Sequence, residues 1–569
     1  MRESRGRSVG ARKRHRCRGP ATRSCFWRNR TEAREDFQGH FAGHFGTSIA
    51  LARRMGILNL SSEPCLVPRD EGPDVVEVVT PATDSAYFVE TRLAKPGFFA
   101  RVAANPARDW VLLFLAIQCL VNVDGNTNAH SRWASMAALA EDHSFRIDKY
   151  HEQTIDWAQT PDGHYYSNKA PGPALLGYPL FLLMDKISTR GAKDREERDR
   201  KRLEDRSAVL HALSVATQAI PYGLIVLGLI AALRRMGLPV RALHVAALAL
   251  LFGNTGSLFM NTYCGHGMAT TFVVALLLAW HKNRPFLVGL FFGLATLCDY
   301  GAALLLLPLL WVLWRRSGTR LRRFGRFVLG GVMPAAVFAA YHQYCFGSPL
   351  SLPNKFQNPA FVDIANVVPN LWGVLRLVPR AEVVADLLWS TQRGLLFTQP
   401  WILLSLLIVP FLFWHKSGWL PERRAFVRWT SVFGAFGLIL LLGMNASFGG
   451  WHGGATPGPR YLAVVFPALA LAMTGIYTRA SEFWRQALVV TLVVSVVLFV
   501  LFYSTAELLA QPSDPLSPFY FNLLVGGQGK NLSRCLFIVL GFAWAGWRAV
   551  QGVRRETGAE HLLSEGAAG

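Results

Sequence analysis

Carboxylates, aromatic rings and cations are concentrated in one polar stretch early in the chain, residues 124–170. Asp156 lies there beside Trp157. Asp124 lies where a first apolar run ends, and partial burial at such a place raises the pKa of a carboxyl group. A carboxylate can take the proton of an attacking hydroxyl group. Asp156, and in second place Asp124, are therefore the candidate catalytic carboxylates of this stretch.

The same stretch ends in the segment HYYSNKAPGP, which supplies two rings, a hydroxyl, an amide and an ammonium group before a stiff Pro-containing backbone. Lys169 can hold a phosphate as a point charge, and Tyr165 and Tyr166 can stack on a sugar or a prenyl unit. Tyr and Lys also serve as plain interfacial anchors in membrane proteins, so this alternative stays open.

Three arginines extend the predicted phosphate site. Arg132 lies in NAHSRW, Arg393 in TQRGLLF and Arg460 in GGATPGPRY. The last two lie in segments that are otherwise poor in cations, where glycine lets the backbone approach a ligand closely. Guanidinium groups neutralise and bind phosphate oxygens. Together with Lys169 these arginines are therefore the candidate anion-binding residues of the chain.

Two further residues are predicted to contact the substrate, namely His266 in TYCGHGMA and Trp451 in FGGWHGG. A lone histidine at the end of an apolar run is more often a structural residue, and this alternative stays open. Asp299, between two apolar runs, is a weaker site candidate, because capping the next helix would explain it equally well.

Apolar runs must position these residues. The chain has 569 residues, of which 51% are hydrophobic, and short basic loops separate its apolar runs. A soluble core has no use for many helices that are apolar all round, whereas a membrane span needs about 20 apolar residues. The sequence therefore predicts an all-α polytopic membrane protein with about 12 transmembrane helices, near 110–123, 208–233, 239–259, 268–281, 285–299, 301–314, 327–345, 399–414, 425–443, 459–477, 486–504 and 533–549.

Basic residues set the predicted orientation, because Lys and Arg in short loops mark the cytoplasmic side. If residues 171–187 crossed the membrane, every later basic loop would face outward. We therefore expect this Pro-rich segment to lie along the outer interface without spanning. The long first outer loop, residues 124–207, then carries interfacial helices. Residues 346–398 and 444–460 form the other outer loops, and both termini are cytoplasmic.

The net charge and the cysteines limit which other classes of protein the chain can belong to. Of the formal charge of +22, the first 54 residues supply 14 Lys and Arg against 4 Asp and Glu. This segment lacks interleaved aromatic residues, so we expect a disordered extension, with no nucleic-acid partner. The eight cysteines are scattered singly, which predicts neither a metal site nor a cofactor. The predicted divisions are a disordered basic extension with a cytoplasmic tail (1–100), a transmembrane domain (105–555) and a C-terminal tail (556–569).

The order of these segments resembles the integral-membrane glycosyltransferases of the GT-C superfamily, specifically the dolichyl-phosphate-mannose-protein mannosyltransferase-like and lipid A aminoarabinose transferase-like enzymes. In that family the first outer loop carries a D-E-x-R-Y motif and a Y-x-x-K-P-P-L motif. Arg132 and Trp133 match the R-Y part, and YYSNKAPGP matches the Lys-Pro part, with Ala170 replacing the first Pro. Ala129 and His130 stand where the family has its catalytic Asp and Glu, so another residue must supply the acid or the chemistry differs.

The resemblance, which covers residues 105–480, implies transfer of a sugar from a polyprenyl-phosphate donor to an acceptor hydroxyl. It implies a carboxylate that takes the acceptor proton as general base, for which we predict Asp156 or, in second place, Asp124. It also implies cations that bind the donor phosphate, for which we predict Arg132, Lys169, Arg393 and Arg460. The enzyme would lie in the cell's inner (plasma) membrane with its active site facing outside the cytoplasm. Its partners would be the lipid bilayer, the lipid-linked sugar and an acceptor that the sequence does not specify. A multi-span transporter or flippase is the main alternative, disfavoured because no internal repeat is visible and the spans contain almost no charge. A sugar-polymer ligase or polymerase and a non-catalytic scaffold stay open.

Overall fold

In this computed structural model the chain divides into two compact units, residues 1–95 and 96–569. Each unit is considered by itself. The structure describes residues 75–80, 88–93, 97–123, 127–315, 320–361, 370–371, 375–391, 393–414, 421–454, 458–505 and 531–568.

Three small hairpins depart from the all-α prediction. The first unit holds β1 (Val75–Thr80) paired antiparallel with β2 (Phe88–Leu93), inside the segment 1–100 that was predicted to comprise the basic extension and a cytoplasmic tail. The β1 sequence VVEVVT is rich in β-branched residues, which favour strands. The second unit adds two shorter antiparallel pairs, β3 (Trp157–Gln159) with β4 (Tyr165–Ser167) and β5 (Asn370–Leu371) with β6 (Leu375–Arg376).

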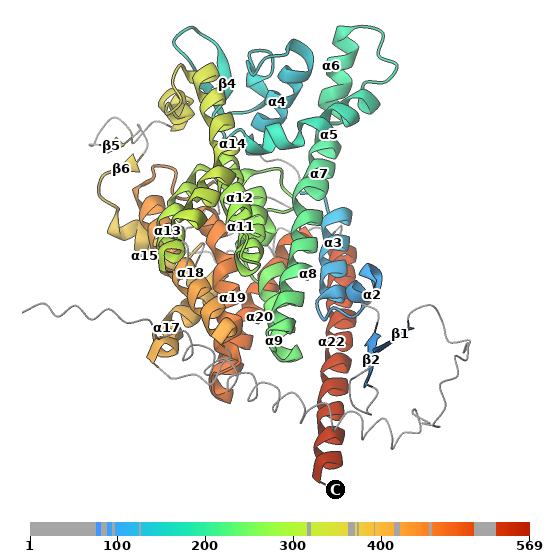
Figure 1. Cartoon of the computed structure of the whole chain (residues 1–569). Helices are drawn as coiled ribbons and strands as arrows, with labels where there is room; N and C mark the ends of the chain where they lie inside the picture. Colours follow the sequence, from blue (N-terminus) through green and yellow to red (C-terminus); the bar gives the residue numbers. More distant parts are fainter. Residues whose placement is uncertain are drawn as a thin grey trace, which may run out of the picture. The chain divides into compact units, whose positions relative to one another are not determined.

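Helices form the rest of the second unit, and Figure 1 shows most of them running side by side as a bundle. Each of the twelve predicted apolar runs contains at least one helix. The helices of the bundle and its connections are α2 (Phe98–Ala103), α3 (Arg108–Leu120), α7 (Arg206–Ser214), the π-helical η2 (Val215–Ala219), α8 (Ile220–Arg235), α9 (Val240–Leu251), α10 (Thr255–Leu258), α11 (Gly265–His281), α12 (Pro285–Cys298), η3 (Tyr300–Leu305), α13 (Leu306–Arg315), α14 (Arg320–Phe346), η4 (Pro353–Phe356), η5 (Pro359–Phe361), α15 (Ala381–Trp389), α16 (Leu395–Thr398), α17 (Pro400–Trp414), α18 (Pro421–Ser447), η6 (Arg460–Val465), α19 (Phe466–Tyr477), α20 (Glu482–Thr505) and α22 (Asn531–Ala568).

Apolar length marks the chain as a membrane protein. Among the described residues, six helical segments are long and apolar enough to cross a bilayer, judged by length and composition alone, and four shorter apolar helices accompany them. The count of about 12 crossings stays a prediction. The six segments are Arg206–Arg235, Arg320–Phe346, Arg424–Ser447, Arg460–Tyr477, Glu482–Ser504 and Leu532–Gly558.

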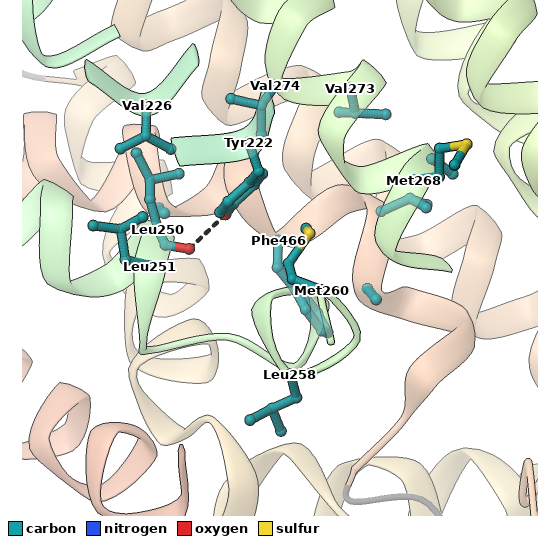
Figure 2. Close-up of a cluster of buried hydrophobic side chains, with 14 of the residues drawn as sticks. Tyr222, Val226, Leu250, Leu251, Leu258, Met260, Met268, Val273, Val274 and Phe466 are labelled. Carbon is teal, nitrogen blue, oxygen red and sulfur yellow. Dashed lines mark hydrogen bonds between the residues drawn. The ribbon is translucent and has the colours of Figure 1, made fainter. Parts of the chain in front are cut away.

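Close helix packing builds the bundle core. Figure 2 shows Tyr222 of α8 donating a hydrogen bond to the carbonyl of Leu250 near the end of α9, with Phe466 of α19 nearby. Between α12 and α14 the backbones meet at Gly289 and Gly330. A Cβ added at Gly289 would lie 1.9 Å from the Phe327 carbonyl oxygen, and one added at Gly330 would lie 2.0 Å from the Phe286 carbonyl oxygen. Small residues allow such contact between membrane helices.

A polar cap, defined here as residues 127–204, gathers at one end of the bundle (Figure 1). It comprises α4 (Thr127–Asp142), η1 (His151–Gln153), the β3–β4 hairpin, α5 (Gly172–Ser188) and α6 (Arg195–Glu204). The helix α5 covers the segment expected not to span; it packs on α4 and α7, and it is not one of the candidate spans. From the cap, the continuous helix α7–η2–α8 runs to the other end of the bundle and ends in Arg234 and Arg235 (Figure 1).

A buried ion network fixes the cap. Arg202 of α6 is 5% exposed and pairs with both carboxylate oxygens of Asp185 on α5, at 2.6 and 3.0 Å. The same guanidinium pairs with Glu141 of α4 at 3.0 Å, and Glu141 also accepts hydrogen bonds from Lys149 and Tyr150. The sequence of α6, REERDRKRLE, is almost entirely charged, as is typical of a solvated helix. Its i,i+4 pair Lys201–Glu197 agrees with that, but Arg202 faces inward.

This network predicts a pH-dependent loss of cap stability. Burial alone would raise the pKa of Glu141, but Tyr150, Lys149 and Arg195 lower it from 4.5 to about 2. A carboxyl whose folded pKa is depressed stabilises the fold above its unfolded pKa, and this contribution is lost as pH falls from 4.5 toward 2. Pepsin should therefore cleave the cap increasingly over this range.

The variant Glu141→Gln should be cleaved more readily at pH 4.5 and show a flatter pH dependence below it. Glu204→Gln is the matched control, because Glu204 is exposed and makes only one long ion pair. Equal pH dependence in Glu141→Gln and the wild type would contradict this role for Glu141.

Candidate active site

The β3–β4 hairpin brings Asp156 and Lys169 together. Its register pairs Trp157 with Ser167, so the residues just outside the ladder become neighbours, and the amide of Asn168 donates to the carbonyl of Asp156 at 3.4 Å. The Lys169 Nζ atom lies 2.7 Å from Asp156 Oδ1. The two residues are thirteen positions apart in the sequence, and the hairpin makes them an ion pair.

Helix α4 holds the other side of this pair. Thr127 donates its hydroxyl to Asp156 Oδ2 at 2.8 Å, and Ser131, one turn later, donates to the Asp156 carbonyl and contacts the Ser167 hydroxyl at 2.6 Å. Thr127 and Ser131 are spaced i,i+4 and therefore share one helix face. The sequence analysis missed this pair, although its spacing was a visible signal.

The surroundings keep Asp156 ionised. Burial would raise the pKa of its carboxyl, but Lys169, Thr127 and Arg460 together hold it below the ordinary value. Burial lowers the pKa of the Lys169 ammonium, as do Arg460 and Arg132, while Asp156 opposes that shift. An ionised carboxylate paired with a cation accepts a proton poorly. The resting geometry therefore does not favour the predicted role of Asp156 as the general base.

Arg132 is a buried cation that forms no ion pair with a carboxylate of the described residues. It lies on α4, is 4% exposed, and its Nη1 donates to the Asn128 carbonyl at 3.0 Å and to the Asn128 side chain. Its Nε has no hydrogen-bond partner, and among the described residues no carboxylate lies within ion-pair distance of its guanidinium. The first residue of α11 must be glycine here, because a Cβ on Gly265 would lie 3.0 Å from Arg132 Nη2 and 2.1 Å from the Cys298 carbonyl.

Arg460 enters from η6. Its guanidinium lies over the Tyr461 ring, 5.0 Å from the centroid, and its Nη2 donates to the Tyr461 hydroxyl at 3.0 Å. Its Nε is buried without a partner, and no ion pair is found for it within the described part of the chain. The charge of Arg460 acts on both Asp156 and Lys169. Arg132, Lys169 and Arg460 thus form one cationic cluster around Asp156.

Arg393 is adjacent to this cluster and has a different set of contacts. It is buried, and its Nη1 donates to the carbonyls of His452 and Gly454, the latter at 3.1 Å. Burial and the charge of Arg460 lower its pKa. The geometry gives Arg393 a role in holding the turn that contains His452. Its predicted role in binding phosphate stays a prediction.

His266 and Asp299 form a hydrogen-bonded pair beside the cluster. The His266 Nδ1 atom lies 2.6 Å from Asp299 Oδ2, while Asp299 Oδ1 accepts from the Gly301 amide at 3.0 Å and caps η3. The His266 ring meets the Tyr461 ring edge to face, with centroids 5.4 Å apart. Both roles weighed for Asp299, helix cap and site residue, therefore fit the geometry at once.

Three further residues were predicted to belong to the site. Tyr165 and Tyr166 make packing contacts in the cap, and Asp124 is not among the described residues. Tyr166 is 3% exposed and packs on Phe346, so its ring faces are not open to a sugar; strand alternation in β4 turns it away from Ser167. Its predicted sugar-stacking role is therefore corrected to packing. Tyr165 is half-buried and stacks on His151 at 4.0 Å, which covers one ring face. Asp124 lies outside the described residues.

Trp451 is half-buried and packs beside the cluster of Val383, Leu387 and Ala446, with its ring 6.1 Å from that of His452. Its predicted contact with substrate stays untested. Among the described residues, no group of three or more His, Cys, Asp or Glu side chains could hold a metal ion.

Comparisons with known proteins were made on the whole chain. No protein-family model matches the sequence, and no curated protein matches it. Among solved structures, the chain is similar to the crystal structure of ArnT from Cupriavidus metallidurans bound to undecaprenyl phosphate, at 15% identity and a TM-score of 0.39 over 82% of this chain and 80% of that one. The apo structure of the same protein gives 15% identity and a TM-score of 0.38 over 80% and 75%.

ArnT is a lipid A aminoarabinose transferase of the GT-C superfamily, the group that the sequence motifs resemble. At this identity and these TM-scores the similarity assigns no activity to the chain.

Proposed function

We propose that the chain is a membrane glycosyltransferase that moves a sugar from a polyprenyl-phosphate donor to an acceptor hydroxyl on the extracytoplasmic face. One observation carries the proposal: Arg132 and Arg460 are guanidinium groups without a carboxylate partner among the described residues, and each has a buried, unpartnered Nε–H. Burying a cation is costly unless an anion compensates it. A phosphate group presents several acceptor oxygens and suits arginine geometry.

Charge in the cluster fits such a donor. Among the described residues, the cations Arg132, Lys169 and Arg460 face the carboxylates of Asp156 and Asp299, which leaves one positive charge in excess. A sugar linked to a lipid through a phosphodiester carries one negative charge. The cluster lies at the end of a bundle of apolar helices, where a lipid chain can extend along the bundle while its phosphate reaches the cations.

The residues of the cluster have different roles in the proposed transfer reaction. The acceptor oxygen attacks the anomeric carbon, a carbon–oxygen bond forms, and the bond from that carbon to the phosphate oxygen breaks. Polyprenyl phosphate leaves with the electron pair and gains negative charge. Arg132, Lys169 and Arg460 stabilise this developing charge, which is the largest contribution expected of fixed cations. Asp156 and Thr127 hold Lys169 in place.

The test is transfer of radiolabel from a panel of polyprenyl-phosphate sugars, with the full-length protein in membrane vesicles. Wild-type vesicles should release free polyprenyl phosphate and label an acceptor fraction. Vesicles lacking the protein provide the background. If no donor of the panel is turned over or bound by the wild type, the proposed function is wrong, whereas facilitated movement of intact donor across the bilayer would support the flippase alternative.

A further inference from the structure

The His266–Asp299 pair has the geometry of a proton-accepting dyad. An ionised carboxylate can only accept hydrogen bonds, so the 2.6 Å contact between Asp299 Oδ2 and His266 Nδ1 places a proton on Nδ1. The other ring nitrogen, Nε2, then carries the free lone pair. Asp299 is itself fixed, because its second oxygen caps η3 through the Gly301 amide.

The Nε2 atom of His266 is available. Among the residues that the structure describes, it has no hydrogen-bond partner, and the side chain keeps 10% of its surface exposed. His211 and His342 differ in this respect, because both of their ring nitrogens contact protein groups. Both ring nitrogens of His211, for example, are in contact with protein oxygens, Asn261 Oδ1 at 3.2 Å and the Cys119 carbonyl at 3.1 Å.

Three elements fix the dyad against the cationic cluster. His266 is the second residue of α11, directly after Gly265, which touches the Arg132 guanidinium. Its ring packs on Tyr461, and the Arg460 guanidinium lies over the same Tyr461 ring. The charges of Arg460 and Arg132 both act on His266. A phosphate held by these arginines would therefore present its sugar close to His266.

We propose that His266 is the general base of the transfer reaction and that Asp299 is its positioning residue. This rests on the proposed function and names a residue for its proton step. The acceptor hydroxyl gives its proton to His266 Nε2 as its oxygen bonds to the anomeric carbon. The carbon–phosphate-oxygen bond breaks, and its electron pair stays on the polyprenyl phosphate. The resulting imidazolium is stabilised by the Asp299 carboxylate.

Charge balance is consistent with a proton on His266, and the existing contacts of Asp156 favour His266 over that carboxylate. With a phosphodiester bound, the single excess positive charge of the cluster is neutralised. Transfer converts the diester to a phosphomonoester with a second negative charge, and a proton on His266 adds the matching positive charge. A proton on Asp156 would give the same total, but this carboxylate is already paired with Lys169 and hydrogen bonded to Thr127.

The test compares turnover, donor affinity and pH dependence of His266→Gln and Asp299→Asn with the wild type in nanodiscs. Removing a general base should lower kcat about 10²–10⁴-fold, with the donor KM changed by less than about 3-fold, since the phosphate contacts remain. Asn is a good N-cap, so Asp299→Asn keeps η3 capped while removing the charge that orients His266; we expect kcat to fall by at least about 10-fold.

The pH profile is the readout that a structural role would not change. The neutral imidazole is the active form, so wild-type kcat should fall with decreasing pH, and His266→Gln should lack this limb. The groups that face His266 are Asp299 before η3, Arg132 on α4, and Arg460 and Tyr461 on η6, and none of them is changed in this variant. A profile unchanged by His266→Gln would overturn the proposal.

Controls separate the possible failures. The variant His211→Gln changes a half-buried histidine outside the cluster, and it should keep the wild-type kcat and unfolding temperature. The donor KM and the unfolding temperature of each variant show whether it is folded. If the wild type transfers sugar and His266→Gln matches it, only the dyad proposal fails. If Asp156→Asn, and not His266→Gln, removes the low-pH limb, Asp156 is the base. If the wild type neither binds nor turns over donor, the proposed function itself fails.

Discussion

Replacing Lys169 by methionine is expected to lower the free energy of unfolding by about 3–5 kcal/mol, because Asp156 is then left buried without its ion-pair partner. Asp156 is 9% and Lys169 19% exposed in this pair, and their atoms are 2.7 Å apart. The same substitution should abolish detectable transfer, since the proposed phosphate loses its only lysine. Thermal and denaturant unfolding in mild detergent, followed by intrinsic fluorescence, measures the first effect.

A double-mutant cycle separates stability from function. Lys169→Met combined with Asp156→Asn removes both charges, so most of the lost stability should return while transfer stays lost. Lys201→Met is the matched control, because Lys201 makes a partly exposed i,i+4 pair with Glu197 and an exposed hydrogen bond to the Arg190 carbonyl, and its replacement should cost less than about 1 kcal/mol. Additive losses in the double variant would show that the two side chains do not interact as the structure has them.

Replacing Arg460 by alanine should lower kcat for sugar transfer about 10²–10³-fold with little loss of stability, because the group acts mainly on charge that develops in the transition state. Arg460 makes no ion pair among the described residues, so no carboxylate is left without its partner when it is removed. Arg460→Lys should recover part of the rate, since lysine supplies charge without the planar pair of donors.

The measurement is the initial rate of donor consumption at saturating and at limiting donor concentration, made on the same protein preparations. Arg479→Ala, beyond the other end of α19, serves as the control and should transfer at the wild-type rate. Wild-type kcat in Arg460→Ala would exclude this arginine from the phosphate site and leave its buried position without a functional explanation.

The sequence predicted the helices better than it predicted the short strands and the packing contacts between elements. Apolar length alone located a helix in every predicted run, because a bilayer fixes how many apolar residues a span needs. The short hairpins were missed, since three-residue strands give no periodic signal. The burial of Trp133 was not predicted either: α4 packs into the cap and leaves this side chain with no exposed surface.

For the site, too, the sequence indicated the chemistry of single residues better than the contacts between them. The structure brings together Arg132, Lys169 and Arg460, three of the four cations that the sequence predicted to bind phosphate, and the phosphate role itself stays a prediction. The sugar-stacking role predicted for Tyr166 does not fit its place in β4. Neighbouring residues in a strand point to opposite faces, and the sequence does not show which face is open. The contact between His266 and Asp299 joins residues 33 positions apart and needs the fold of α11 and α12 to be seen.

The most direct measurement is the position of the phosphorus atom in an experimental structure of the protein with a polyprenyl phosphate bound in lipid nanodiscs. The account predicts phosphate oxygens within hydrogen-bond distance, about 3 Å, of Lys169 Nζ and of the guanidinium nitrogens of Arg132 and Arg460. A phosphate bound at the end of the bundle that carries Arg234 and Arg235, or density that leaves these three cations without contact, would contradict it.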